Sequence, residues 1–179
     1  MTEIGCVYGQ ALYDLAIGEG IAEDVLKQLN VLRQSFDQEP EFLKLLSTPS
    51  LTKQECCEIL DHSFRGKLQP YLLNFLKLLT EKGYIRYFSS CCSAYRDRYN
   101  QDHGILPVEV VTAVALTSAQ EKRLKDKLEK LTGKTVELNC KIDPDCLGGV
   151  RLDYDGQRLD DTVAHRLDAI RGLLKNTVL

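Results

Sequence analysis

Seven cysteines are the residues of this sequence best suited to chemistry, and their spacing is unusual. They are Cys6, Cys56, Cys57, Cys91, Cys92, Cys140 and Cys146. A zinc site takes ligands two to four residues apart, usually as two such pairs. Adjacent residues on a helix point about 100° apart, so neither Cys-Cys pair makes a good chelate. We therefore expect reduced, partly buried thiols that hold no metal, and a thiol-dependent enzyme stays open as an alternative.

The histidines and the one glycine pair offer no catalytic pattern. His62, His103 and His165 stand far apart, and none has a His or Cys neighbour at metal-ligand spacing. Gly148-Gly149 lacks the Lys-Ser/Thr ending of a phosphate loop and the spacing of a dinucleotide-binding loop. We interpret Gly148 and Gly149 as structural residues that allow a positive φ or a close backbone approach at the start of a strand.

Six aspartates form an acidic cluster in the second half of the chain: Asp143, Asp145, Asp153, Asp155, Asp160 and Asp161. The ligand spacing and the closing glutamate of a calcium loop are missing. Turn formation and helix capping account for most of these residues. We expect no metal and no cofactor.

The composition argues against several classes of function. The net charge of −3 comes from well-mixed acidic and basic residues, without the basic stripe of a nucleic-acid binder, so we expect no nucleic-acid partner. The first residues show no basic stretch followed by an apolar one, so we expect no secretory leader. The densest apolar run, 71–79, is too short to span a bilayer, so we expect attachment to a membrane only through partners.

The first hundred residues show the apolar period of consecutive amphipathic helices. The helices are predicted to begin near Ile4, Ile21, Pro40, Thr52, Pro70 and Tyr84. Thr52 and Glu55 form a capping box, and Gly83 offers a left-handed stop after the fifth helix. Six short helices with short connections predict an antiparallel bundle.

Each predicted helix has an apolar stripe. The stripe of the first helix is Ile4, Val7, Tyr8, Ala11, Leu12 and Leu15, and that of the second is Ile21, Val25, Leu29, Leu32 and Phe36. The third has Phe42, Leu43, Leu45 and Leu46, the fourth Ile59, Leu60 and Phe64, and the sixth Ile85, Phe88, Cys92, Tyr95 and Tyr99.

The fifth helix has almost no polar face. Its apolar residues are Tyr71, Leu72, Leu73, Phe75, Leu76, Leu78 and Leu79. A helix that is apolar all round is either central in its bundle or presents one side to a partner. A bundle of about 100 residues can enclose few helices completely. On these residues alone, both interpretations stay open.

From Gly104 the apolar period changes to two, which predicts a β-α-β-β-α order. A first strand has Leu106, Val108, Val110, Thr112 and Val114 on one face, and a helix over 117–132 has Leu124, Leu128 and Leu131, closed by Gly133. A second strand places Val136, Leu138, Cys140 and Ile142 inward, and a third has Val150, Leu152 and Tyr154. Asp155-Gly156 predicts a hairpin, and a last helix has the stripe Val163, Leu167, Ile170 and Leu174. The chain is therefore α+β, with a six-helix bundle over 1–104 and a small α/β domain over 105–179.

Two stretches of the chain resemble a known family. The segment 136–150, with the following 151–171, is similar to the C-terminal signature of F-type ATP synthase delta subunits, the family of the oligomycin sensitivity-conferring protein. Residues 7–16 resemble the first helix of that family. One departure is that Asp161-Thr162 stands where the family usually has Gly-Ser, although threonine can still cap a helix.

The resemblance implies a non-catalytic stator subunit on the cytoplasmic or stromal face of an energy-transducing membrane. It implies that the helical bundle binds N-terminal helices of the alpha subunits and that the α/β domain binds the b subunits of the peripheral stalk. Carried onto this chain, the alpha-binding face is Tyr8, Ala11, Leu12, Leu15, Asn74, Phe75, Leu78 and Leu79. A helical adaptor unrelated to ATP synthase remains the other non-enzymatic alternative.

Overall fold

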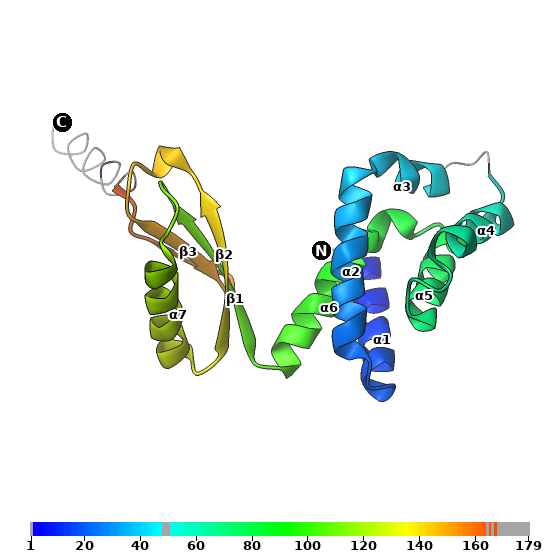
Figure 1. The fold of residues 1–179 in the computed structure, drawn as a ribbon, viewed down its shortest axis with the longest axis horizontal. Coiled ribbons are helices and arrows are strands. Elements are labelled where there is room, and N and C mark those ends of the chain that lie inside the picture. The colour runs from blue at the N-terminus through cyan, green and yellow to red at the C-terminus, as the bar shows by residue number, and fades with distance from the viewer. Residues whose placement is uncertain (1, 48–50, 164, 166, 168–179) are drawn as a thin grey trace, which may run out of the picture. The chain divides into compact units, whose positions relative to one another are not determined.

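The computed structural model describes residues 2–47, 51–163, 165 and 167 of the chain. The chain divides into two compact units, Met1–Tyr99 and Asn100–Leu179 (Figure 1). The division lies within the last helix of the first unit, slightly before the boundary at Gly104 expected from the change of period. Among the described residues, no helix has the length and apolar character needed to cross a membrane.

The first unit is helical, as predicted. Its elements are α1 (Glu3–Gly18), α2 (Ala22–Gln38), α3 (Pro40–Ser47), α4 (Lys53–Phe64), α5 (Pro70–Glu81), the 3₁₀ turn η1 (Ile85–Tyr87) and α6 (Phe88–Asp102). The sixth helix therefore begins at Phe88, because the residues after Tyr84 first form a 3₁₀ turn. The capping box of α4 is confirmed: the Thr52 N–H donates to the Glu55 carboxylate at 2.7 Å, and the Glu55 N–H donates to the Thr52 hydroxyl at 3.3 Å.

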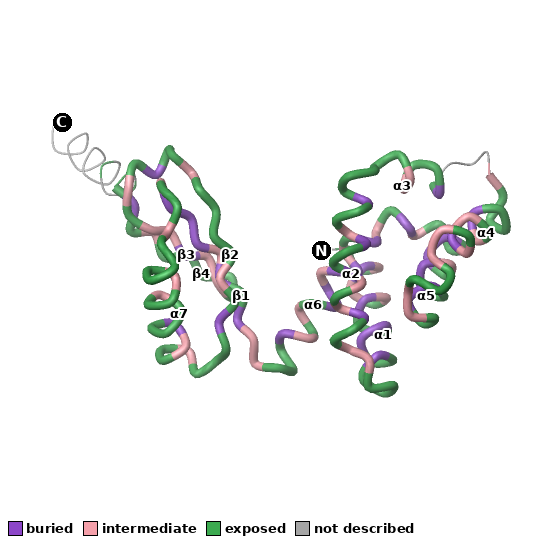
Figure 2. Tube along the Cα trace, viewed as in Figure 1, coloured by how far each residue is buried: buried purple, intermediate pink, exposed green. Residues whose placement is uncertain are grey.

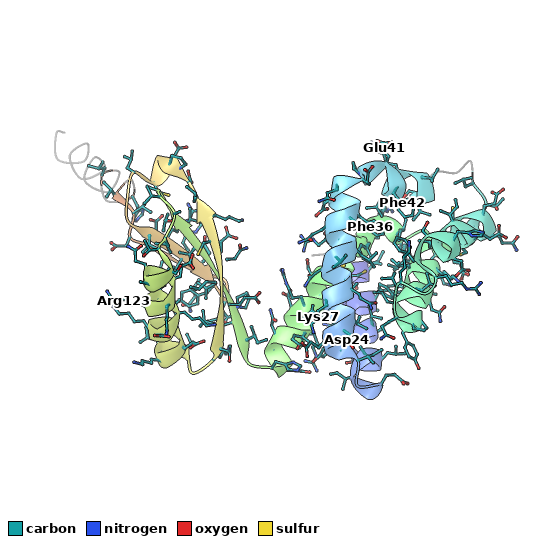
Figure 3. All side chains as sticks on the ribbon, viewed as in Figure 1. Asp24, Lys27, Phe36, Glu41, Phe42 and Arg123 are labelled. Carbon is teal, nitrogen blue, oxygen red and sulfur yellow. The ribbon has the colours of Figure 1, made fainter. Side chains whose placement is uncertain are left out.

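The core of the first unit lies around α2. Four of the five residues of the stripe predicted for the second helix are buried, namely Val25, Leu29, Leu32 and Phe36, while Ile21 at the N-cap is half-buried against the core. Figure 2 shows the burial along the chain. The Phe36 ring stacks on that of Phe42 with centroids 5.6 Å apart (Figure 3), and meets the ring of Phe88 at 5.1 Å. Leu45 was expected on the apolar side of α3 but is exposed, since Leu46 is the buried residue there. Aromatic packing therefore joins α2, α3 and α6.

The second unit is a four-stranded sheet of order β2-β1-β3-β4 with one helix, α7 (Ser118–Thr132). The strands are β1 (Ile105–Thr112), β2 (Thr135–Ile142), β3 (Val150–Tyr154) and β4 (Gln157–Asp160). β1 is parallel to β2 and antiparallel to β3, which is antiparallel to β4. Leu106, Val108, Val110, Val136 and Leu152 pack with Leu128 of α7. Arg123 lies on the side of α7 away from the strands (Figure 3).

Several apolar residues predicted to face this core are exposed. Val114 lies beyond the end of β1, and Leu131 of α7 is 82% exposed. Cys140 and Ile142 are also exposed, although their neighbours Val136 and Leu138 on the same strand face pack in the core. The cluster beneath α7 takes in only the first half of β2, so the helix leaves the end of that strand uncovered.

The turns of the second unit follow the predicted local signals. Gly133 ends α7 with φ +68°, and the β3–β4 hairpin turns at Asp155 and Gly156, both with positive φ. The Thr162 hydroxyl accepts from the His165 N–H at 3.2 Å, which caps the last helix. Of the stripe predicted for that helix, Val163 and Leu167 are exposed, while Ile170 and Leu174 lie outside the described residues.

Candidate functional site

A groove of about 360 Å³ lies between α1 and α5. We call it the α1/α5 groove, and its lining is Tyr8, Ala11, Leu12, Leu15, Tyr71, Asn74, Phe75 and Leu78. All the residues predicted for the binding face line it except Leu79, which is completely buried in the bundle core. Tyr71 is a lining residue that was not on the predicted face. Tyr71 lies four positions before Phe75 and so shares its face of α5, and this spacing could have identified it.

The groove exists because α1 buries a different face from the one that its apolar stripe indicates. The buried residues of α1 are Gly5, Gly9, Leu12, Tyr13 and Ala16, whereas Val7, Ala11 and Leu15 of the predicted stripe are exposed. A Cβ atom on Gly5 would lie 2.4 Å from the Cβ of Ser90, so α1 and α6 approach too closely for any larger residue. Gly5 and Gly9 therefore place the face of α1 with small residues against the core, and the face with aliphatic side chains is exposed to solvent.

The floor of the α1/α5 groove is buried and its rim is open to solvent. Leu12 and Phe75 are 5% and 7% exposed, while Leu15, Tyr71 and Leu78 are 43%, 38% and 40% exposed. Asn74 is exposed, and no charged side chain lines the groove. Such a surface can bind the apolar face of a helix.

Two tyrosines mark the ends of the groove. The ring of Tyr8 meets that of Tyr84 edge-on, with centroids 5.8 Å apart. At the other end, the nearby Glu19 carboxylate raises the pKa of Tyr71, first through its negative charge. Each ring therefore has a neighbour from the other side of the groove.

Most of the cysteines lie in environments that disfavour the reactive thiolate. All seven are free, and Cys56, Cys91, Cys92 and Cys146 are buried. Burial raises the pKa of Cys91 to about 11 and that of Cys92 to about 12, whereas a nucleophilic cysteine needs a lowered pKa. Exposed Cys140 also has a raised pKa, first through desolvation and then through the charge of Glu121. These environments count against a thiol-dependent enzyme.

The three histidines lie on different elements of the fold. His62 lies on α4, His103 follows α6, and His165 lies in the last helix. In the part of the chain that the structure describes, no three His, Cys, Asp or Glu side chains gather closely enough to hold a metal ion.

The glycine pair Gly148-Gly149 has a tight backbone environment. Gly148 has φ +151° and Gly149 has φ +83°. A Cβ atom on Gly149 would lie 2.3 Å from the carbonyl oxygen of Asp161, so the entrance to β3 passes directly against the start of the last helix. The Val163 N–H also donates to the carbonyl of Gly148 at 3.0 Å. The pair therefore joins β3 to the last helix by backbone contact alone.

The second unit has a cavity of about 530 Å³ beside the edge strand β2. Its walls come from α7, β2 and Ile105 at the start of β1, and they include Glu121, Lys122, Lys125 and Glu137. Among the described residues, this mixed acidic and basic lining contains no cluster able to hold a metal ion, and no sequence signal pointed to the cavity.

The fold of the whole chain matches a solved structure. The matching chain belongs to the cryo-EM structure of the Toxoplasma gondii mitochondrial ATP synthase hexamer, with a TM-score of 0.78 and 22% sequence identity. The match covers 97% of this chain and 98% of the other. At this identity, the likeness shows a shared fold.

The sequence itself matches one family model and many relatives. The model, ATP synthase delta (OSCP) subunit, matches residues 4–174. ATP synthase subunit delta 1 of Syntrophotalea carbinolica is 32% identical, with 98% of each chain covered. ATP synthase subunit delta of Gloeothece citriformis is 31% identical, with 94% of this chain and 92% of the relative covered. The chain therefore belongs to the ATP synthase delta (OSCP) subunit family.

Proposed function

We propose that this chain is a non-catalytic stator subunit that links the catalytic head of an F-type ATP synthase to its peripheral stalk. In this role the α1/α5 groove binds an N-terminal helix of an alpha subunit, and the second unit binds the b subunits. The observation that carries the proposal is the apolar groove, which has a buried floor and an open rim.

The physical character of the groove suits a helical partner. An amphipathic helix binds a groove through apolar anchors at i, i+3, i+4 and i+7, and a few buried contacts supply most of the binding free energy. Leu12 and Phe75 form a floor for such anchors, and Leu15 and Leu78 can close over them. A stator must resist torque during rotation, so slow dissociation matters more than fast encounter.

Exposed apolar residues near one end of the sheet support binding of the stalk by the second unit. Ile142 pairs with Thr112 at the ends of β2 and β1, and the Thr112 hydroxyl donates to the carbonyl of Val114. Leu147 precedes Gly148, whose carbonyl accepts from the Val163 N–H. Ile142, Val114 and Leu147 are 61%, 73% and 67% exposed. Such residues mark an interaction surface when they gather at one place.

Titration calorimetry with the N-terminal peptide of the cognate alpha subunit tests the head-binding site. We expect Tyr8→Ala or Leu78→Glu to weaken binding about tenfold or more, because each removes or charges an apolar contact in the groove. Val31→Glu is the matched control, since Val31 on α2 is 61% exposed and lies outside the groove. Unchanged affinity in both groove variants would place the alpha-binding site elsewhere.

Reconstitution tests the linking role as a whole. Membrane sectors stripped of the head and of this subunit should recover ATP-driven proton pumping only when the subunit is added back with the head. The subunit should also co-purify with alpha, beta and b chains. Pumping that recovers equally without it would contradict a stator function and favour an unrelated helical adaptor. In this proposal the chain reaches the cytoplasmic or stromal face of the membrane through its partners.

A further inference from the structure

The two ends of the α1/α5 groove differ in charge. Tyr71 at the start of α5 lies close enough to Glu19, which directly follows α1, for that carboxylate to raise its pKa, while Tyr8 in the first half of α1 contacts Tyr84, which follows α5. The two helices therefore run antiparallel along the groove. One end is marked by Leu15 and Tyr71, and the other by Tyr8 and Leu78.

A charged residue stands one helical turn beyond the last groove residue of each helix. Glu19 follows Leu15 by four positions, and Lys82 follows Leu78 by four positions. Both residues keep a right-handed helical backbone, with φ −91° and ψ −5° at Glu19 and φ −79° and ψ −9° at Lys82. Since residues i and i+4 share a helix face, Glu19 and Lys82 lie just beyond the two ends of the groove lining, and both residues are exposed.

Three further charged residues of α1 and α5, which are Lys77, Glu81 and Asp14, do not cancel this difference. Lys77 is 2.7 Å from Asp61 of α4 and so lies on the α4 side of α5. Glu81 also faces α4, where burial and then the charge of Glu81 raise the pKa of Cys57. Exposed Asp14, next to Leu15, has the same sign as Glu19.

We infer, on the basis of the proposed docking function, that the α1/α5 groove binds its partner helix in one direction. A basic side chain of that helix lies beside Glu19, and an acidic side chain lies beside Lys82. The uncharged lining supplies affinity without a preferred direction, because an apolar stripe fits in either orientation. The reversed helix places like charges together at both ends, which disfavours that orientation.

The test uses a designed amphipathic helical peptide with one leucine stripe, lysines near its N-terminus, glutamates near its C-terminus and a nitroxide at the N-terminus. Paramagnetic broadening of backbone amides in the full-length protein reports where the labelled end lies. We expect broadening at Leu15 and Tyr71 to exceed that at Tyr8 and Leu78. Exposed ion pairs are weak, about threefold each, so we expect about a tenfold preference between orientations. The preference should shrink in 1 M salt.

Two charge variants make the result decisive. In Glu19→Lys/Lys82→Glu the broadening should move to Tyr8 and Leu78, and in Glu19→Gln/Lys82→Gln it should affect both ends. A peptide that binds with the same orientation in all three proteins overturns the directional inference and leaves the docking proposal intact. If neither this peptide nor the alpha peptide binds, the docking proposal itself is wrong.

Discussion

A Cβ atom placed on Gly9 of α1 would lie 2.4 Å from the carbonyl oxygen of Cys91 on α6, so the two backbones are in direct contact there. The same added atom on Gly9 would also lie 2.8 Å from the Cβ of Ala94. α1 is thus held against α6 on one side, while Tyr8, Ala11 and Leu15 on another side line the α1/α5 groove.

Gly9→Ala should destabilise the first unit, because the new methyl group meets backbone that cannot move freely. We expect a loss of about 1–3 kcal/mol in the free energy of unfolding, measured by urea denaturation. Gly18→Ala is the control: Gly18 is the last residue of α1, and no atom lies within 4 Å of its added Cβ. It should equal or exceed the wild type in stability. Equal stability of the two variants would show that α1 and α6 can move apart to make room for the methyl group.

The Asp61–Lys77 pair should make part of the stability depend on pH. The hydrogen bond from Lys77 at 2.7 Å lowers the pKa of Asp61. Because the folded-state pKa is the lower one, this contribution is present above the unfolded pKa of about 4 and is lost as the pH falls through the folded value. Asp61→Asn should therefore be less stable than the wild type at pH 7, and the difference should vanish in acid. Urea titrations at several pH values measure this difference in stability. A difference that does not change with pH would show that the ionised Asp61 carboxylate does not stabilise the fold.

Alkylation should follow thiol exposure and pKa. At pH 8 we expect iodoacetamide to label Cys140 first and to spare Cys91 and Cys92, since these two are buried and have raised pKa values of about 11 and 12. Peptide mass spectrometry after timed quenching gives the order. Binding of the alpha peptide should survive labelling of Cys140. Rapid labelling of Cys91 or Cys92 in the folded protein would contradict the closely packed α1–α6 contact.

Two leucines of α7 should respond differently to the same substitution. Leu128 is 7% exposed and packs on the sheet, whereas Leu131 is 82% exposed. Leu128→Ala should cost about 2–5 kcal/mol, and Leu131→Ala should change stability by less than about 0.5 kcal/mol. Thermal unfolding followed by circular dichroism compares them. A large loss for Leu131→Ala alone would mean that this helix packs by its other face.

Gly149→Ala should destabilise the second unit through both backbone strain and contact. Gly149 has φ +83°, and an added Cβ would lie 2.3 Å from the carbonyl oxygen of Asp161. Gly156→Ala separates the two effects, because Gly156 has φ +73° but no atom within 4 Å of the added Cβ. We expect Gly149→Ala to be the more damaging by about 1–3 kcal/mol in urea denaturation. Equal losses would mean that strain alone matters at both glycines.

Many elements of this fold follow from local sequence. Thr52 with Glu55, Gly133 and Asp155-Gly156 each act within a few residues, through hydrogen bonds or backbone conformations that hardly depend on the rest of the chain. The stripe of α2 was predictable for a related reason, since a helix packed mainly on one side buries one continuous face. The family resemblance also pointed to all but one residue of the candidate face.

Only the tertiary structure decided which apolar residues are covered. Leu79 is in the core and Tyr71 on the groove rim, because the burial of α5 depends on where α1 and α4 lie. Ile142 is exposed because α7 covers only the first half of β2. Sequence periodicity shows that a residue is apolar and on which face it lies. Whether that face is filled by the chain itself or left for a partner depends on the distances between helices, and in α1 those distances are set by Gly5 and Gly9.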